Sequence, residues 1–161
     1  MKLNHYTTML CTVFIGLIAT SCNVSVITQK TYTFSVNALD GCTNTNLTVT
    51  TGDSLSFGAQ GSASFGIQDG FKSDVDPSGH FKYSGSSTLP IDNVKYDSTA
   101  LDGNSPVGSL LGKVGLNGPV FFIGKSKSYQ ASQSGTLYLC FNDNSQYLSD
   151  NSGSYSVTLT K

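Results

Sequence analysis

Charged residues are scarce in this chain of 161 residues. Only 12% of them are Asp, Glu, Lys or Arg, and the formal net charge is −1. A nucleic-acid-binding surface clusters Lys and Arg to neutralise phosphates. The sequence has no such basic stripe, so we expect no nucleic acid among its partners. Intrinsic disorder is also disfavoured, because the net charge is low and 11% of residues are aromatic.

Histidine is nearly absent as well. The chain has two, and His80 is the only one beyond residue 22. Zinc sites need about three or four His, Cys or Asp ligands, and C-x-x-C spacing is missing. A Ser-His-Asp triad would depend on His80, with no Gly-x-Ser-x-Gly elbow before a helix. A Gly-rich phosphate loop ending in Lys-Ser or Lys-Thr is also missing. We therefore expect no enzymatic activity.

No segment after residue 22 has the i, i+3, i+4, i+7 stripe of an amphipathic helix. Apolar and polar residues alternate instead, most clearly in 32–36 and 155–159, and Gly, Asn, Asp and Ser separate the runs. This alternation is typical of β-strands joined by turns. The other strand-like segments are 47–49, 55–57, 107–114, 119–124 and 137–141. The pattern predicts an all-β fold, either a sandwich or a barrel.

Residues 1–22 have the layout of a secretory signal peptide. Lys2 precedes an apolar stretch at 9–19, and small residues follow. The stretch is shorter than the roughly 20 residues of a membrane-spanning helix, which makes an uncleaved anchor the weaker alternative. Cys22 comes directly after the small residues, as in a bacterial lipobox that lacks its preferred Leu. We predict lipidation of Cys22, with simple secretion as the alternative.

The chain is thus predicted to contain a signal peptide at 1–22, a polar tether at 23–31 and one domain at 32–161. A domain of this size can bury a substantial core. The predicted location is the cell envelope, as an outer membrane lipoprotein, or the medium outside. Membrane contact is expected only through the N-terminal lipid, whose methylenes each contribute about 0.8 kcal/mol when buried.

Two cysteines remain once Cys11 and Cys22 are assigned to the signal peptide and the lipid site. Cys42 and Cys140 either pair as a disulfide in an oxidising compartment or stay separate buried thiols. Their Cα separation decides between the two, and the sequence does not supply it. A disulfide that closes so long a loop would contribute about 4–5 kcal/mol.

Residues 67–106 have little strand character. This stretch is rich in Gly, Ser, Asp and Pro and has few apolar residues. A long irregular segment in a compact domain is usually functional or mobile.

Oxygen-bearing side chains gather in residues 142–153, between two strand-like runs. They include the carboxylates of Asp143 and Asp150 and the amides of Asn144 and Asn151. Ca²⁺ takes about 6–8 oxygen ligands, so this loop could hold it. It is not an EF-hand, because the Gly and Glu of that motif are missing at the required positions. From the residues alone, a calcium loop and an ordinary Asp/Asn-rich turn both remain open.

Residues 135–143 (GTLYLCFND) and 150–159 (DNSGSYSVTL) are similar to the C-terminal signature of the PA-I-like galactophilic lectin family. Further segments resemble that family in the same order along the chain. They are 51–57 (TGDSLSF), 61–66 (GSASFG), 76–79 (DPSG), 106–115 (PVGSLLGKVG) and 119–124 (PVFFIG). The resemblance covers nearly all of 32–160. It implies a small antiparallel β-sandwich, jelly-roll-like and galactose-binding-domain-like, with one Ca²⁺ that coordinates two neighbouring sugar hydroxyls.

The resemblance also implies which residues form the site. Metal ligands would be the side chains of Asp143, Asp150 and Asn151 and the main-chain oxygens of Phe65 and Tyr147. The implied sugar-binding residues are Phe65, Asp76, His80, Asp143, Asn144 and Asp150. Hydrogen bonds between carboxylates and metal-polarised hydroxyls belong to the stronger, charge-assisted class.

The sequence departs from the family at several positions. Phe65 replaces a more usual tyrosine, a change that is tolerable if only its carbonyl binds metal. Asp76 stands near the place of a histidine that helps to hold the sugar's primary hydroxyl, which leaves the preference for galactose open, although His80 lies close by. With no Trp in the chain, Phe71, Phe81 or Tyr83 would have to supply an aromatic face for a sugar, unless they pack in the core.

The leading hypothesis is a calcium-dependent lectin of a bacterial envelope that binds galactose or other diol-bearing glycans. The alternative is a structural envelope lipoprotein of the same fold, stabilised by calcium but without sugar binding. A glycosidase is disfavoured, because bound Ca²⁺ would keep both Asp143 and Asp150 ionised and leave no general acid. Members of the family can be multimeric, so an oligomer is compatible with the sequence. The arrangement of 67–106 separates the two hypotheses, since a loop packed over the site would leave no open position on the metal.

Overall fold

The computed structural model describes residues 5–6, 27–68, 71–81 and 94–161. Apart from His5 and Tyr6, the predicted signal peptide lies outside the described residues, and so do the predicted lipidation site Cys22 and residues 23–26 of the tether. Residues 82–93 of the long polar stretch, with Tyr83, also lie outside them. Within the part of the chain that is described, no helix is long and apolar enough to cross a membrane.

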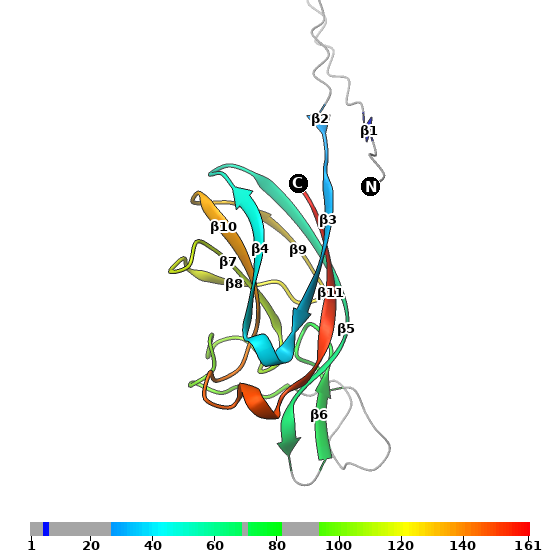
Figure 1. Cartoon of the computed structure of the whole chain (residues 1–161), viewed down its shortest axis with the longest axis vertical. Helices are drawn as coiled ribbons and strands as arrows, with labels where there is room; N and C mark the ends of the chain where they lie inside the picture. The colour runs from blue at the N-terminus through cyan, green and yellow to red at the C-terminus, as the bar shows by residue number, and fades with distance from the viewer. Residues whose placement is uncertain (1–4, 7–26, 69–70, 82–93) are drawn as a thin grey trace, which may run out of the picture.

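Two antiparallel sheets face each other and form the body of the molecule (Figure 1). The first sheet has the order β3 (Thr31–Asn37), β11 (Ser152–Thr160), β5 (Ser54–Gln68) and β6 (Phe71–Val75), and β9 (Ser126–Gln130) also pairs with β5. The second has the order β4 (Cys42–Val49), β10 (Gly135–Phe141), β7 (Leu110–Val114) and β8 (Val120–Phe122). A small separate pair joins β1 (His5–Tyr6) to β2 (Ile27–Thr28). The predicted all-β sandwich is therefore confirmed.

Strand β5 is long enough to pair with two different strands along one of its edges. Along one edge it pairs with β11 from Ser56 to Ser64. Along the other edge, its first part pairs with β9 and its last part with β6. The 15 residues of β5 thus run the length of the sandwich and carry Phe65 to the end opposite Asp53.

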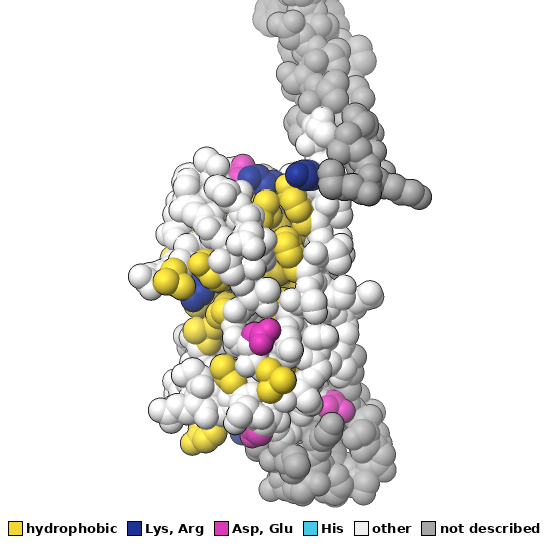
Figure 2. All heavy atoms as spheres, viewed as in Figure 1, with side chains coloured by type: hydrophobic (Ala, Val, Ile, Leu, Met, Phe, Trp, Pro, Cys, Tyr) yellow, Lys and Arg dark blue, Asp and Glu magenta, His cyan; other side chains and the backbone are white. Residues whose placement is uncertain are grey.

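The core lies between the sheets and follows the predicted alternation. In β11, Tyr155, Val157 and Leu159 are completely buried, while the intervening side chains face solvent. Leu137 and Leu139 of β10, in the facing sheet, are completely buried as well. Each such side chain contributes about 1.5–3 kcal/mol by leaving water. Figure 2 shows hydrophobic side chains along the seam between β4 and β3, and few charged ones on this face.

Strands β6 and β9 were not expected from the sequence. Strand β6 falls within 67–106, which was predicted to be irregular, and that part of the prediction is wrong. Strand β9 reads Ser-Lys-Ser-Tyr-Gln and has little apolar content. Both are short and pair with β5 through backbone hydrogen bonds. Two residues separate the end of β5 from the start of β6, whereas β9 is far from β5 in the sequence, and both depend on this partner more than on their own pattern.

Cys42 and Cys140 form a disulfide between β4 and β10. The two residues stand directly opposite each other in the strand register, with Cα atoms 4.0 Å apart. This settles the alternative that the sequence left open. At the same end of these strands lie the short 3₁₀ helices η1 (Ala38–Asp40) and η2 (Leu148–Asp150), together with the loops at 94–107 and 142–151 (lower part of Figure 1).

Candidate functional site

The loop that follows β10 is tied to the 94–107 segment by one buried side chain. Asn142 donates from its amide to the carbonyl oxygens of Asp102, Ser105 and Pro106 at 3.0, 3.0 and 2.9 Å. Its side-chain oxygen accepts from the N–H of Asp102 at 2.9 Å. Nearby, the N–H of Leu101 donates to the carbonyl of Asp143. These bonds hold the 94–107 segment against the residues predicted to bind metal.

Four of the predicted site residues line one pocket of about 230 Å³. Phe65 comes from β5, while Asp143, Tyr147 and Asp150 come from the loop between β10 and β11. Lys95, Asp97 and Val107 complete the lining and were not predicted. We call this cavity the acidic pocket. Segments about 80 residues apart in the chain are thus brought together as the resemblance implied.

Asp143 brings an unsatisfied oxygen to the acidic pocket. Its Oδ1 accepts from the N–H of Asn144 at 2.8 Å. Its Oδ2 is buried and has no hydrogen-bond partner among the described residues. Burial raises the pKa of the Asp143 carboxyl, and the negative charges of Asp150 and Asp97 raise it further, against the lowering effect of Asn151 and of the Asn144 N–H. A buried acceptor left without a donor is costly and calls for a partner.

Asn151 is not among the residues that line the acidic pocket, but it also has a buried oxygen without a partner in the described part of the chain. The residue is 5% exposed, and its Nδ2 donates to the carbonyl of Ala38 at 3.2 Å. Its Oδ1 is buried without a partner. Asn151 lies close enough to lower the pKa of Asp143, but its amide hydrogen bond goes to Ala38. Two predicted metal ligands therefore each keep one buried oxygen free to accept.

Asp150 lies against the backbone of β5. A Cβ placed on Gly66 would come within 2.5 Å of Asp150 Oδ2. Gly66 also has φ of +100°, which side-chain-bearing residues rarely adopt. The close approach brings the carboxylate next to the main chain that follows Phe65. The missing Cβ is what leaves room for Asp150 there.

Tyr147 and Phe65 both line the acidic pocket, and their rings lie in different surroundings. That their main-chain oxygens bind metal stays a prediction. The Tyr147 ring is 60% exposed, and its carbonyl accepts from the N–H of Asp150 at 3.2 Å. A carbonyl oxygen has a second lone pair for another partner. The Phe65 ring is buried against Phe81, with centroids 5.8 Å apart. Phe81, suggested as a sugar-facing aromatic, therefore packs against the core instead.

The charges of the acidic pocket do not balance within the protein. Three carboxylates, from Asp97, Asp143 and Asp150, face one ammonium, from Lys95, which leaves a formal charge of −2. The Lys95 amine lies 5.6 Å from the centroid of the Phe65 ring. Hydrogen bonds from the hydroxyl and N–H of Thr99 lower the pKa of Asp97, which keeps it ionised. A divalent cation would neutralise this pocket.

The donor set fits a hard cation such as Ca²⁺. The described residues include no group of three or more His, Cys, Asp or Glu placed to hold a metal by themselves. The predicted set has only two such residues and relies on amide and main-chain oxygens, which Ca²⁺ accepts readily. The two orphaned oxygens of Asp143 and Asn151 are of this type.

Asn144, predicted to contact sugar, follows Asp143 in the chain but is not among the residues that line the acidic pocket. Its Nδ2 donates to Thr99 Oγ1 at 3.0 Å, and its Oδ1 accepts from the N–H of Gln146 at 2.9 Å. These contacts fix its side chain toward the 94–107 segment. Its role in sugar binding stays a prediction.

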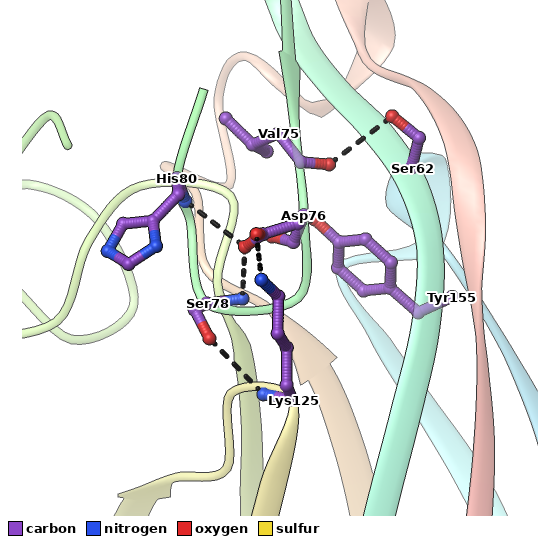
Figure 3. Close-up of polar contacts among 7 residues, drawn as sticks. All are labelled: Ser62, Val75, Asp76, Ser78, His80, Lys125 and Tyr155. Carbon is purple, nitrogen blue, oxygen red and sulfur yellow. Dashed lines mark hydrogen bonds and ion pairs between the residues drawn. The ribbon is translucent and has the colours of Figure 1, made fainter. Parts of the chain in front are cut away.

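Asp76 and His80 are not among the residues that line the acidic pocket. The Asp76 carboxylate is 2.7 Å from Lys125 Nζ and accepts from the N–H groups of Ser78 and His80 (Figure 3). The imidazole of His80 points away from Asp76, whereas the backbone N–H of His80 faces the Asp76 carboxylate. Tyr155 donates its hydroxyl to the carbonyls of Asp76 and Gly108 at 3.0 and 2.7 Å. Asp76 thus has a clear role in holding the turn at 76–80, and its predicted sugar contact stays a prediction.

His80 lines a second pocket of about 500 Å³, with Val94, Tyr96 and Phe122 among the residues around it. We call this cavity the aromatic pocket. A larger hollow of about 650 Å³ lies over β5 and β9 and is lined mainly by Ser, Gln and Thr side chains. Four of the predicted site residues line the acidic pocket, whereas another of them, His80, lines the aromatic pocket.

Sequence reasoning missed Lys95 and Asp97. Both fall in the stretch expected to be irregular, and Asp97-Ser98-Thr99 has the composition of an ordinary turn. The sequence pattern held no signal for their place in the pocket. That depends on the hydrogen bonds of Asn142 with residues 102–106.

The two facing sheets, with a loop-bounded pocket at one end, define a small antiparallel β-sandwich. Among solved structures, the chain is similar to the N-terminal domain of EclA, described as a PllA-like lectin. The TM-score is 0.56 and the sequence identity 23%, over 80% of this chain and 93% of that chain. At this identity the likeness concerns the fold. No protein-family model matches the chain, and no curated protein matches it either.

Proposed function

We propose that this protein is a calcium-dependent carbohydrate-binding lectin that belongs with the PA-I-like galactophilic lectins. Asp143, Asp150 and Asn151 would hold Ca²⁺ with their side chains, and Phe65 and Tyr147 with their main-chain oxygens. The ion, when bound, would polarise two neighbouring hydroxyls of a galactose-type sugar. The proposal includes export to a bacterial envelope, with Cys22 lipidated, and no enzymatic activity.

One observation carries the proposal above the others. The buried Oδ2 of Asp143 and Oδ1 of Asn151 have no hydrogen-bond partner. A buried, unpaired acceptor costs about 1–3 kcal/mol, and more if it is charged. A hard cation would satisfy both oxygens and the formal charge of −2 in the acidic pocket together.

The carboxylates have a second part in the proposal. Once a cation is present, Asp143 and Asp150 would remain ionised. They could then accept hydrogen bonds from the sugar hydroxyls. These hydrogen bonds would be stronger than usual, because metal-bound hydroxyls are more acidic. The described part of 94–107 forms a wall of the pocket, and Tyr147 beside it is 60% exposed. That the bound metal keeps an open position for the sugar stays a prediction.

The metal assignment is tested by replacing Asp143 and Asp150 with Ala together. Calcium should raise the melting temperature of the wild-type protein, because it binds the folded state and satisfies its buried oxygens. The double variant should lose this rise. Differential scanning calorimetry with calcium and with a chelator measures both.

The matched control is Asp53→Asn. Asp53 pairs with Lys161 at 2.6 Å and precedes β5, while Phe65 lies near its other end, roughly 35–40 Å away along the strand. This variant should keep the full calcium response despite losing a carboxylate. An unchanged response in the Asp143/Asp150 double variant would sink the site assignment.

A further inference from the structure

The acidic and aromatic pockets share their walls. Residues 94–97 alternate between them: Val94 and Tyr96 line the aromatic pocket, and Lys95 and Asp97 line the acidic one. The 104–107 segment also borders both pockets: Asn104, Ser105 and Pro106 line the aromatic pocket, and Val107 lines the acidic one. The N–H of Val107 donates to the carbonyl of Lys95 at 2.7 Å, which joins the two segments. The pockets are therefore next to each other, separated by one thin layer of chain.

The lining of the aromatic pocket suits an uncharged amphipathic ring. Tyr96 and Phe122 are 57% and 37% exposed, large values for aromatic side chains. His80, Asn104 and Ser78 place polar groups around them. None of the described residues that line this pocket is Asp, Glu, Lys or Arg. Exposed aromatic groups with a few polar ones are typical of ligand sites.

The turn at 76–80, which carries Ser78 and His80 of the aromatic pocket, is held by polar contacts. The carboxylate of Asp76 accepts from the N–H groups of Ser78 and His80, and Lys125 pairs with that carboxylate (Figure 3). The Oγ of Ser78 accepts from the N–H of Lys125 at 3.3 Å. These contacts fix the backbone of the turn that presents His80. A pre-formed wall of this kind lowers the entropic cost of binding.

We infer that the aromatic pocket is a second sugar subsite, which binds the ring next to the one held at the acidic pocket. This inference rests on the proposed function. The C–H face of a pyranose would lie on Tyr96 or Phe122, and its hydroxyls would reach His80 and Asn104. The ligand class that follows is an uncharged glycan of at least two sugar rings. The Asp76-Lys125 pair then acts as a positioning element of the second subsite.

The test compares one sugar ring with two, in the presence of calcium. Isothermal titration would use methyl galactoside as the single ring, and lactose, melibiose and longer galactose-terminated oligosaccharides as the extended ligands. At least one extended ligand should bind about tenfold more tightly than methyl galactoside, a difference of about 1.4 kcal/mol. The double variant Tyr96→Ala, Phe122→Ala should remove that gain and leave the affinity for methyl galactoside within about twofold of wild type.

The control is Leu116→Ala. Leu116 is 65% exposed and lines neither pocket, so its removal should leave the gain intact. The inference is overturned if no extended ligand binds more tightly than methyl galactoside, or if the gain survives the double variant. Methyl galactoside binding in either case would leave the proposed function standing. A lack of heat from every sugar would overturn the proposed function and the subsite together.

Discussion

At the scale of single residues, Gly66 controls the space that Asp150 occupies. A Cβ at Gly66 would come within 2.5 Å of the Asp150 carboxylate. We predict that Gly66→Ala displaces this carboxylate and weakens calcium binding by at least about tenfold, or about 1.4 kcal/mol. Calorimetric titration with calcium measures the change.

Gly52→Ala is the matched control for that variant. Gly52 has φ of +92°, close to the +100° of Gly66, but a Cβ there meets nothing within 4 Å. Both variants should therefore lose some stability from backbone strain. Only Gly66→Ala should lose calcium affinity, and equal affinities for calcium in the two variants would argue against a ligand role for Asp150.

Asp76 provides a prediction for pH dependence. Burial alone would raise the pKa of Asp76, but the hydrogen bond from Lys125 and those from the Ser78 and His80 N–H groups outweigh it and lower that pKa. A carboxyl with a lowered pKa in the folded state stabilises the protein above its unfolded pKa, here near 3.8. That stabilisation is lost as the pH falls through the lower, folded-state value.

Asp76→Asn should therefore destabilise the protein at neutral pH by about 1–3 kcal/mol, since charge-assisted hydrogen bonds are lost. The difference from wild type should shrink as the pH drops below about 3.8. Urea unfolding at pH 7 and at pH 3 tests this. A difference that stays constant across this range would show that the Asp76 charge contributes nothing.

The residues of the acidic pocket also show the limit of sequence reasoning. Asp143 and Asp150 stand close together in a loop whose oxygen content is visible in the sequence. The resemblance to a known family added Phe65 and Tyr147. Lys95 and Asp97 join them only because Asn142 ties 102–106 to the end of β10. A contact made by tertiary hydrogen bonds leaves no periodic pattern to detect.

At the scale of elements, the disulfide joins β4 to β10 across 98 residues of sequence. In the chain-entropy account, a loop of this length restricts the unfolded chain by about 4–5 kcal/mol. Replacing Cys42 and Cys140 with Ala together should reduce the free energy of unfolding by roughly that amount. Urea unfolding of the double variant, and of wild type with and without reductant, measures it. A loss below about 1 kcal/mol would contradict this account.

The strands were predictable to different degrees. Strand β11 buries every second side chain from Tyr155 to Leu159, and the last residues of β10 are buried almost without interruption. Their own residues therefore specify them. Strands β6 and β9 pair with the two ends of β5, a partner whose length the sequence did not suggest. Edge strands of this kind form because a neighbour offers free backbone groups. Local pattern cannot locate such strands, whereas the fold class followed from the interior ones.

At the scale of the whole molecule, the sandwich carries its candidate chemistry at one end. The disulfide, both 3₁₀ helices and the loops at 94–107 and 142–151 gather there, while the opposite end is closed by the turn at Asp53 and its pair with Lys161. The buried core thus supports the loop at 142–151, in which Asp143 and Asn151 each have an oxygen without a partner among the described residues. It is the arrangement expected where binding residues sit on loops positioned by a stable scaffold.

The central claim is that one calcium-dependent site in the acidic pocket binds sugar. Isothermal titration of the protein with galactose, with calcium and with a chelator, tests it most directly. The account predicts heat with calcium and none with chelator. Calcium binding without sugar heat would favour a metal-stabilised scaffold of another specificity or of structural function. Sugar heat that persists in chelator, or no calcium binding at all, would contradict the account.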